Sequence, residues 1–161
     1  MTGDGYPGTL KGETTAMNDI ERVANRIKIM NSYVEFLKEH RASERELSED
    51  YLLRSAIERN LQLAIESALD TGEIIISMED LEKPETYRDI IEILEKHRIL
   101  PHEFAERFSE AAGLRNILVH MYTDVDPAII AEVLANRLED FDLYSEYILS
   151  FIEARSSRKS E

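Results

Sequence analysis

The chain has 161 residues, of which 32% are charged and 43% hydrophobic. This length allows one domain with a single sizeable core, and the composition is ordinary for a soluble helical protein. The absence of cysteine excludes disulfides and thiol chemistry. Because there is no apolar run of about 18 residues and no basic-then-apolar leader, we expect no membrane segment and a cytoplasmic location.

The net charge of the chain is −14. An acidic protein repels a polyanion at long range, and binding of nucleic acid normally draws on clustered Lys and Arg side chains. We therefore expect no DNA ligand. An RNA substrate would need a local cleft that concentrates positive charge, and the alternative is an acidic surface that serves a basic protein partner.

The first 16 residues hold four of the six glycines and show no helical periodicity. We interpret residues 1–16 as a disordered leader or an extension, with Met17 as an alternative start. A helical domain is expected over residues 17–152, followed by a polar tail over residues 153–161.

Two long helices are predicted first. Apolar residues step by three and four from Asn18, which predicts a helix to about Ser43. Ser48 is a reasonable N-cap for a second helix that runs to about Ile76. Gly72 is expected to soften the end of that second helix.

Three further helices are predicted after these. Pro84 is expected to open a short third helix in its first turn. Pro101 restarts the chain into a fourth helix that contains Gly113, which costs about 1 kcal/mol relative to Ala and so suggests a close backbone approach. Asp126 and Pro127 are expected to cap one continuous last helix. With no strand pattern, the sequence predicts an all-α, up-down bundle of about five helices.

One segment, residues 113–122, gathers polar side chains among packed aliphatic ones. These side chains are Arg115, Asn116, His120 and Tyr122. On an ideal helix Arg115 and Tyr122 share one direction, whereas Arg115 and His120 point about 140° apart. Arg115 and His120 could meet if the helix unwinds near His120, or if two protomers bring their segments together.

The pattern R-N-x3-H-x-Y in this segment resembles the R-x4-H-x-Y signature of the HepT-like branch of the HEPN superfamily. These proteins are the toxin halves of HEPN/MNT toxin–antitoxin pairs. Further likeness lies in the stretch from Tyr51 to Glu66, in Pro84-x2-Tyr87-Arg88-Asp89 and in Leu100-Pro101. The resemblance extends over roughly residues 17–152 and implies a HEPN-type bundle.

The resemblance implies the toxin of a type VII system, a metal-independent endoribonuclease that cleaves RNA at a homodimer interface. Histidine is the most common general acid or base in proteins, so His120 is the natural group for proton transfer, and Arg115 suits phosphate oxygens. Asn116 could orient the scissile group, and the phenol of Tyr122 can donate or accept a hydrogen bond. In relatives of this kind, an MNT-type nucleotidyltransferase antitoxin transfers AMP to the motif tyrosine, here Tyr122. The homodimer could form part of a larger assembly with that antitoxin.

Other chemistries lack their motifs. No histidine has a glutamate three residues before it, and there is neither a P-loop nor a G-x-S-x-G elbow. We therefore expect no metal and no cofactor. Single Arg, His or Tyr side chains near helix ends are more often caps or ion-pair partners, so a second interpretation stays open. In that interpretation the chain is a non-catalytic partner that binds nucleotide or docks a nucleotidyltransferase.

Overall fold

The computed structural model describes residues 14–120 and 125–159, and every regular element in these ranges is an α-helix. The helices are α1 (Thr14–Glu39), α2 (Glu44–Glu49), α3 (Tyr51–Met78), α4 (Tyr87–Lys96), α5 (His102–Val119), α6 (Pro127–Asn136) and α7 (Leu138–Lys159). The all-α prediction is confirmed, but the described ranges hold seven helices instead of about five. No helix in this described part has the length and apolar character needed to cross a membrane.

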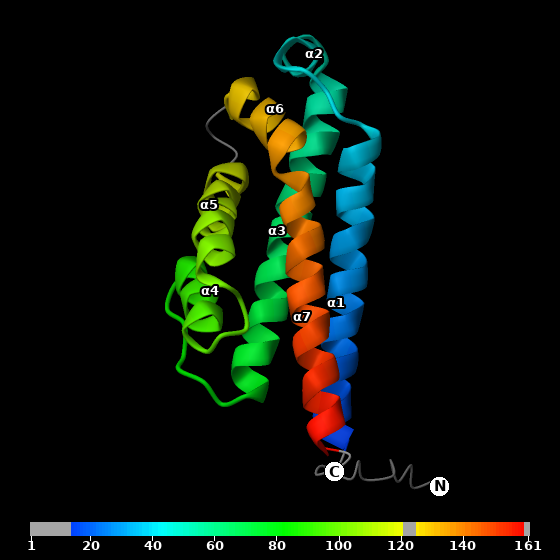
Figure 1. The fold of residues 1–161 in the computed structure, drawn as a ribbon. Helices are drawn as coiled ribbons and strands as arrows, with labels where there is room; N and C mark the ends of the chain where they lie inside the picture. Colours follow the sequence, from blue (N-terminus) through cyan, green and yellow to red (C-terminus); the bar gives the residue numbers. More distant parts are fainter. Residues whose placement is uncertain (1–13, 121–124, 160–161) are drawn as a thin grey trace, which may run out of the picture.

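Three long helices, α1, α3 and α7, form the body of the bundle (Figure 1). Helices α4 and α5 pack against α3, and α5 runs antiparallel to it (Figure 1). The short helices α2 and α6 contact each other at one end of the bundle. Helix α5, which carries the candidate site residues, is therefore held by its neighbours α3 and α4.

The boundary between the first two long helices differs from the prediction. Helix α1 ends at Glu39, and Ser43 caps the additional helix α2. Ser48 is not an N-cap, because it lies inside α2. The carboxylate of Asp50 caps α3 by accepting a hydrogen bond of 3.0 Å from the backbone N–H of Leu53. Aspartate and serine are both good N-caps, so composition alone does not choose between them.

Helix α4 begins later than predicted, because Pro84 lies in the loop that precedes it. Thr86 is the N-cap and forms a capping box with Asp89. The backbone N–H of Asp89 donates to Thr86 Oγ1 (3.2 Å), and Asp89 Oδ2 accepts from the backbone N–H of Thr86 (3.0 Å). This reciprocal pair fixes the first turn of α4, where Tyr87 stands.

The predicted last helix is broken into α6 and α7. Its start is confirmed, since Asp126 caps α6 through the N–H of Ala128 (2.9 Å) and Pro127 is the first helical residue. The break falls at Arg137, where the backbone leaves helical geometry (φ −121°, ψ −7°). The guanidinium of Arg137 binds Glu110 of α5 (3.1 Å), and the break lets α6 turn away from the axis of α7 (Figure 1).

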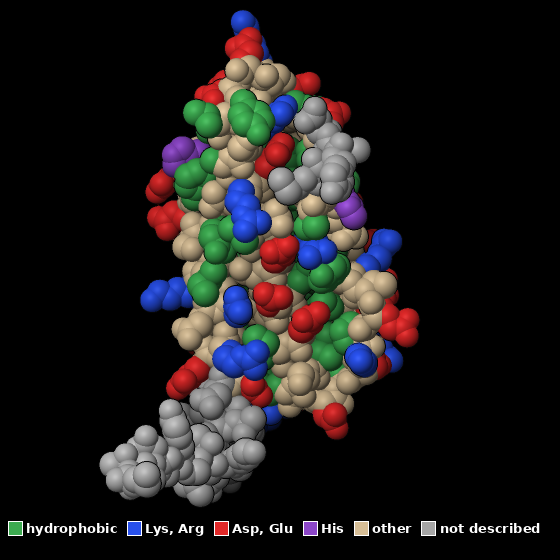
Figure 2. Space-filling model, turned by 180° about the vertical axis from the view of Figure 1, so that it is seen from behind, with side chains coloured by type: hydrophobic (Ala, Val, Ile, Leu, Met, Phe, Trp, Pro, Cys, Tyr) green, Lys and Arg blue, Asp and Glu red, His purple; other side chains and the backbone are tan. Residues whose placement is uncertain are grey.

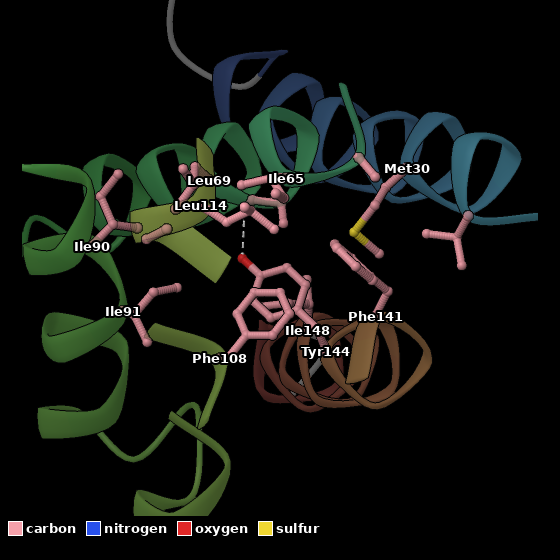
Figure 3. Close-up of a cluster of buried hydrophobic side chains, with 14 of the residues drawn as sticks. Met30, Ile65, Leu69, Ile90, Ile91, Phe108, Leu114, Phe141, Tyr144 and Ile148 are labelled. Atoms are coloured by element: carbon pink, nitrogen blue, oxygen red, sulfur yellow. Dashed lines mark hydrogen bonds between the residues drawn. The ribbon is translucent and has the colours of Figure 1, made fainter. Parts of the chain in front are cut away.

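Close packing of the core depends on Gly72 and not on Gly113. A Cβ atom on Gly72 would lie 2.5 Å from Ile90 Cγ2, so glycine lets α4 approach α3. A Cβ atom on Gly113 would meet nothing within 4 Å among the described residues, so the close approach expected there is wrong. The hydroxyl of buried Tyr144 donates to the carbonyl of Ala68 (2.6 Å; Figure 3). Burial raises the pKa of the Tyr144 phenol.

Candidate functional site

The candidate site residues lie at the C-terminal end of α5. Arg115 is half-buried, whereas Asn116 and His120 are exposed. Helix α5 ends at Val119, and His120 is its C-cap. The backbone N–H of His120 still donates to the carbonyl of Asn116 (3.3 Å). Tyr122 lies outside the described residues, so its predicted place in the site stays a prediction.

The end of the helix does not turn His120 toward Arg115. The φ of His120 is −77°, close to a helical value, and only its ψ of 83° departs from the helix. Since φ sets the direction of Cβ relative to the preceding helix, the side chain leaves in nearly the helical direction. The separation of about 140° between Arg115 and His120 therefore holds within one chain.

Arg115 is held by side chains from two other helices. Its Nε lies 3.5 Å from Glu66 Oε1 of α3, and its Cζ lies 4.1 Å from the ring centroid of Tyr87 of α4. Gln62 donates to the same Glu66 oxygen (3.1 Å). The Nε atom is buried and has no hydrogen-bond partner in the described ranges. Sequence reasoning did not assign Glu66 or Tyr87 to the site, although both stand in the stretches that resemble the HepT-like family.

Glu66 belongs to a polar row along α3 whose members follow every fourth residue. The row consists of Arg54, Glu58, Gln62, Glu66 and Asp70, all half-buried. Asp70 also faces Arg26 of α1 (4.0 Å). Burial raises the pKa of Asp70, an effect that Arg26 opposes. The row holds one base and three acids, so the surface beside Arg115 is not basic. Figure 2 likewise shows acidic and basic side chains interspersed on the face that it draws.

A cavity of about 430 Å³ lies beside α5, between α3, α6 and α7. Its walls are largely apolar and include Leu61, Phe108 and Leu114, with Gly113 also lining it. Ile117 of α5 and Ile129 of α6 also line the cavity while remaining 44% and 43% exposed. Ile117 is three residues before His120 and so lies about 60° from it around the helix. An exposed apolar surface therefore adjoins the histidine side of α5.

Comparison with known proteins agrees with these features. A family model described as ribonuclease HepT-like matches residues 30–148. The tRNA nuclease HepT of Aphanizomenon flos-aquae is 32% identical over 142 residues, which cover 84% of this chain and 95% of that protein. The mRNA nuclease HepT of Shewanella oneidensis is 26% identical over 132 residues, which cover 82% and 98%.

Solved structures share the fold. The tri-AMPylated HEPN toxin of Shewanella oneidensis, solved in complex with an MNT antitoxin, aligns with a TM-score of 0.74 at 23% identity, over 80% of this chain and 97% of that one. A cytosolic protein of unknown function from Bacillus subtilis aligns with a TM-score of 0.69 at 20% identity, over 82% and 92%. The family model spans most of the described helices, and a relative above 30% identity covers 84% of the chain. The chain belongs to the ribonuclease HepT-like family.

Proposed function

We propose that this chain is a metal-independent endoribonuclease, the toxin component of a type VII HEPN/MNT toxin–antitoxin system. The observation that carries the proposal is the end of α5, where a family member presents a half-buried guanidinium and an exposed imidazole five residues apart. The nuclease names of the two HepT relatives support the same activity.

The proposed reaction needs only side chains. The ribose 2′-oxygen attacks the adjacent phosphorus while His120 accepts the 2′ proton. The O2′–P bond forms, the P–O5′ bond breaks, and a protonated imidazole returns a proton to the leaving 5′-oxygen. Arg115 stabilises the added negative charge on the phosphorane oxygens. Asn116 orients the scissile group, and the phenol of Tyr122 supplies a further donor or acceptor.

The site is proposed to form between two copies of the chain. Because the directions of Arg115 and His120 diverge within one chain, a shared phosphate is best reached by Arg115 of one copy and His120 of the partner subunit. The exposed side chains of Ile117 and Ile129 beside His120 offer apolar area for such a contact. A two-fold axis would place two equivalent sites in the dimer.

The partner is proposed to be an MNT-type nucleotidyltransferase that transfers AMP to Tyr122. The AMPylated Shewanella oneidensis toxin, solved with its MNT antitoxin, supports this proposal. A bulky anion near Arg115 and His120 would occupy the phosphate position and neutralise its charge. Tyr122→Phe is expected to escape modification, and mass spectrometry that finds AMP on the variant would contradict this assignment.

The direct test is cleavage of RNA by the purified protein in the presence of EDTA. We expect cleavage by the wild type and a loss of about 10²–10⁴-fold in His120→Ala, since a positioned acid/base group contributes that much. Growth arrest on expression, relieved by the same substitution, would agree with it. Equal residual degradation by both proteins would reject the nuclease and leave the non-catalytic docking partner.

A further inference from the structure

Arg115 is held by two helices other than its own. Its guanidinium lies over the ring of Tyr87, with 4.1 Å between Cζ and the ring centroid, and its Nε faces Glu66 at 3.5 Å. The side chain is 20% exposed. A flexible arginine is thus fixed in one place before any ligand arrives.

The two contacts restrain different features of the guanidinium. A cation over an aromatic face is attracted by the ring quadrupole, which restrains its distance from the ring. The carboxylate of Glu66 attracts the Nε edge of the guanidinium, which restrains its orientation. Gln62 in turn holds that carboxylate by donating a hydrogen bond to Oε1 (3.1 Å). A guanidinium has five N–H donors, so an ion pair at one of them leaves others for a phosphate.

Tyr87 is itself held firmly enough to act as a restraint. It is the first residue of α4, next to the capping box of Thr86 and Asp89. Ile90 and Ile91 of the same helix are buried in the core, and Gly72 gives Ile90 its place against α3. The backbone of Tyr87 is therefore held in place by the packing of α4, while 36% of the residue stays exposed.

We infer that Tyr87 and Glu66 are positioning residues, which aim the guanidinium of Arg115 at the scissile phosphate. The inference rests on the proposed nuclease function. The aromatic face of Tyr87 carries the effect, not its hydroxyl. Glu66 sets the direction of the Nε edge, so its charge and shape both matter. Preorganising a charged donor in this way accelerates the chemical step more than it strengthens binding.

The test compares steady-state cleavage of a fixed RNA by the full chain and by two substitutions of Tyr87. Tyr87→Leu is expected to lower kcat about tenfold with KM nearly unchanged. Tyr87→Phe retains an aromatic face and is expected to keep wild-type activity. In an Arg115→Lys background Tyr87→Leu should cost little more, because the planar group that the ring restrains is already gone.

Matched controls separate positioning from general damage. Tyr51→Leu removes a 72% exposed tyrosine, whose ring centroid lies 5.9 Å from Cζ of Arg54. Glu73→Gln removes an exposed acid two turns beyond Glu66 on α3. Both controls are expected to cleave RNA like the wild type, whereas Glu66→Gln is expected to lower kcat severalfold.

A second readout is independent of activity. The ring current of residue 87 should shift the NMR signal of the Arg115 Nε–H, and this shift should persist in Tyr87→Phe and vanish in Tyr87→Leu. Equal kcat in wild type and Tyr87→Leu, or Tyr87→Phe as slow as Tyr87→Leu, would overturn the inference while the nuclease stands. A wild type with the shifted signal but no RNA cleavage would instead reject the proposed function, and this inference with it.

Discussion

Two arginines of α5, two turns apart, are used in different ways. Arg107 donates from Nε to both carboxylate oxygens of Asp140 (2.9 and 3.0 Å), and its Nη2 lies 2.9 Å from Oδ1. Asp140 is buried on α7, so this bidentate pair ties α5 to α7. Arg115 has a longer ion pair of 3.5 Å and a closer aromatic ring, with 4.1 Å from Cζ to the Tyr87 centroid against 5.6 Å from Arg107 to Phe104.

The difference shows how a protein separates a structural cation from one that can take a ligand. A bidentate carboxylate satisfies Arg107 and neutralises it at short range. The longer contact of Arg115 restrains the guanidinium without a hydrogen bond at Nε among the described residues. We therefore propose a structural role for Arg107 and a chemical role for Arg115, and the first prediction below tests that division.

The largest effect is expected from exchanging the two arginines for alanine. Arg115→Ala should lower RNA cleavage by about 10²–10³-fold, the usual loss when a preorganised donor is removed. Arg107→Ala should lower the free energy of unfolding by about 1–3 kcal/mol, because Asp140 is left buried without its partner. Cleavage assays and urea unfolding of both variants measure the two effects. The division would be contradicted if Arg107→Ala lost activity without losing stability. It would also be contradicted if Arg115→Ala lowered the free energy of unfolding and left cleavage by the folded protein unchanged.

The two glycines of the helical domain should respond with opposite sign. Gly72→Ala forces a Cβ against Ile90 and is expected to cost about 1–3 kcal/mol of overpacking, offset in part by about 1 kcal/mol of helix propensity. Gly113→Ala meets open space and should stabilise the protein by up to about 1 kcal/mol. Thermal unfolding of both variants decides this, and a destabilised Gly113→Ala would contradict it.

A smaller effect is expected at the buried tyrosine of α7. Tyr144→Phe removes the hydrogen bond to the Ala68 carbonyl while it keeps the ring that stacks on Phe108. The expected loss is about 1 kcal/mol of unfolding free energy, with RNA cleavage unchanged. Urea unfolding measures the loss. Altered RNA cleavage at unchanged stability would contradict the purely structural role given to Tyr144.

The smallest effect concerns the N-terminus of α4, where Tyr87 is the first helical residue. Hydrogen bonds from the backbone N–H of Glu85, and then from Thr86, hold the pKa of Asp89 below its ordinary value of 3.8. A lowered folded-state pKa contributes stability above the unfolded-state pKa, and this stability is lost as pH falls through the folded-state value. The midpoint of thermal unfolding should therefore be lower in Asp89→Ala than in wild type at pH 7. The difference between the two midpoints should shrink below pH 3.8. A difference that does not change with pH would show that the ionised carboxylate of Asp89 is not its cause.

The sequence predicts the larger features of the fold well. Helical periodicity identified the apolar face of α1, and Val23, Ile27, Met30 and Val34 are all buried. The cap at Asp126 and Pro127 was also predicted correctly. The short helix α2 and the break at Arg137 were missed, because periodicity continues across both. Spacing along the chain does not reveal the contacts found there, the ion pair between Arg137 and Glu110 and the packing of α2 against α6.

The candidate site was only half visible in the sequence. Arg115, Asn116 and His120 stand in one short segment, so their residue types already suggested acid/base and phosphate chemistry. Glu66 and Tyr87 lie 49 and 28 residues before Arg115, and spacing along one helix cannot join residues from three helices. Only the packing of α3, α4 and α5 brings them to the same guanidinium.

The central claim is that Arg115 of one copy and His120 of the partner subunit act on one phosphate. Co-refolding equal amounts of Arg115→Ala and His120→Ala chains tests it directly. We expect roughly a quarter of wild-type RNA cleavage, since half of the two-fold dimers are then mixed and each mixed dimer carries one intact site. Each variant alone should be inactive. A mixture as inactive as the separate variants would contradict the claim.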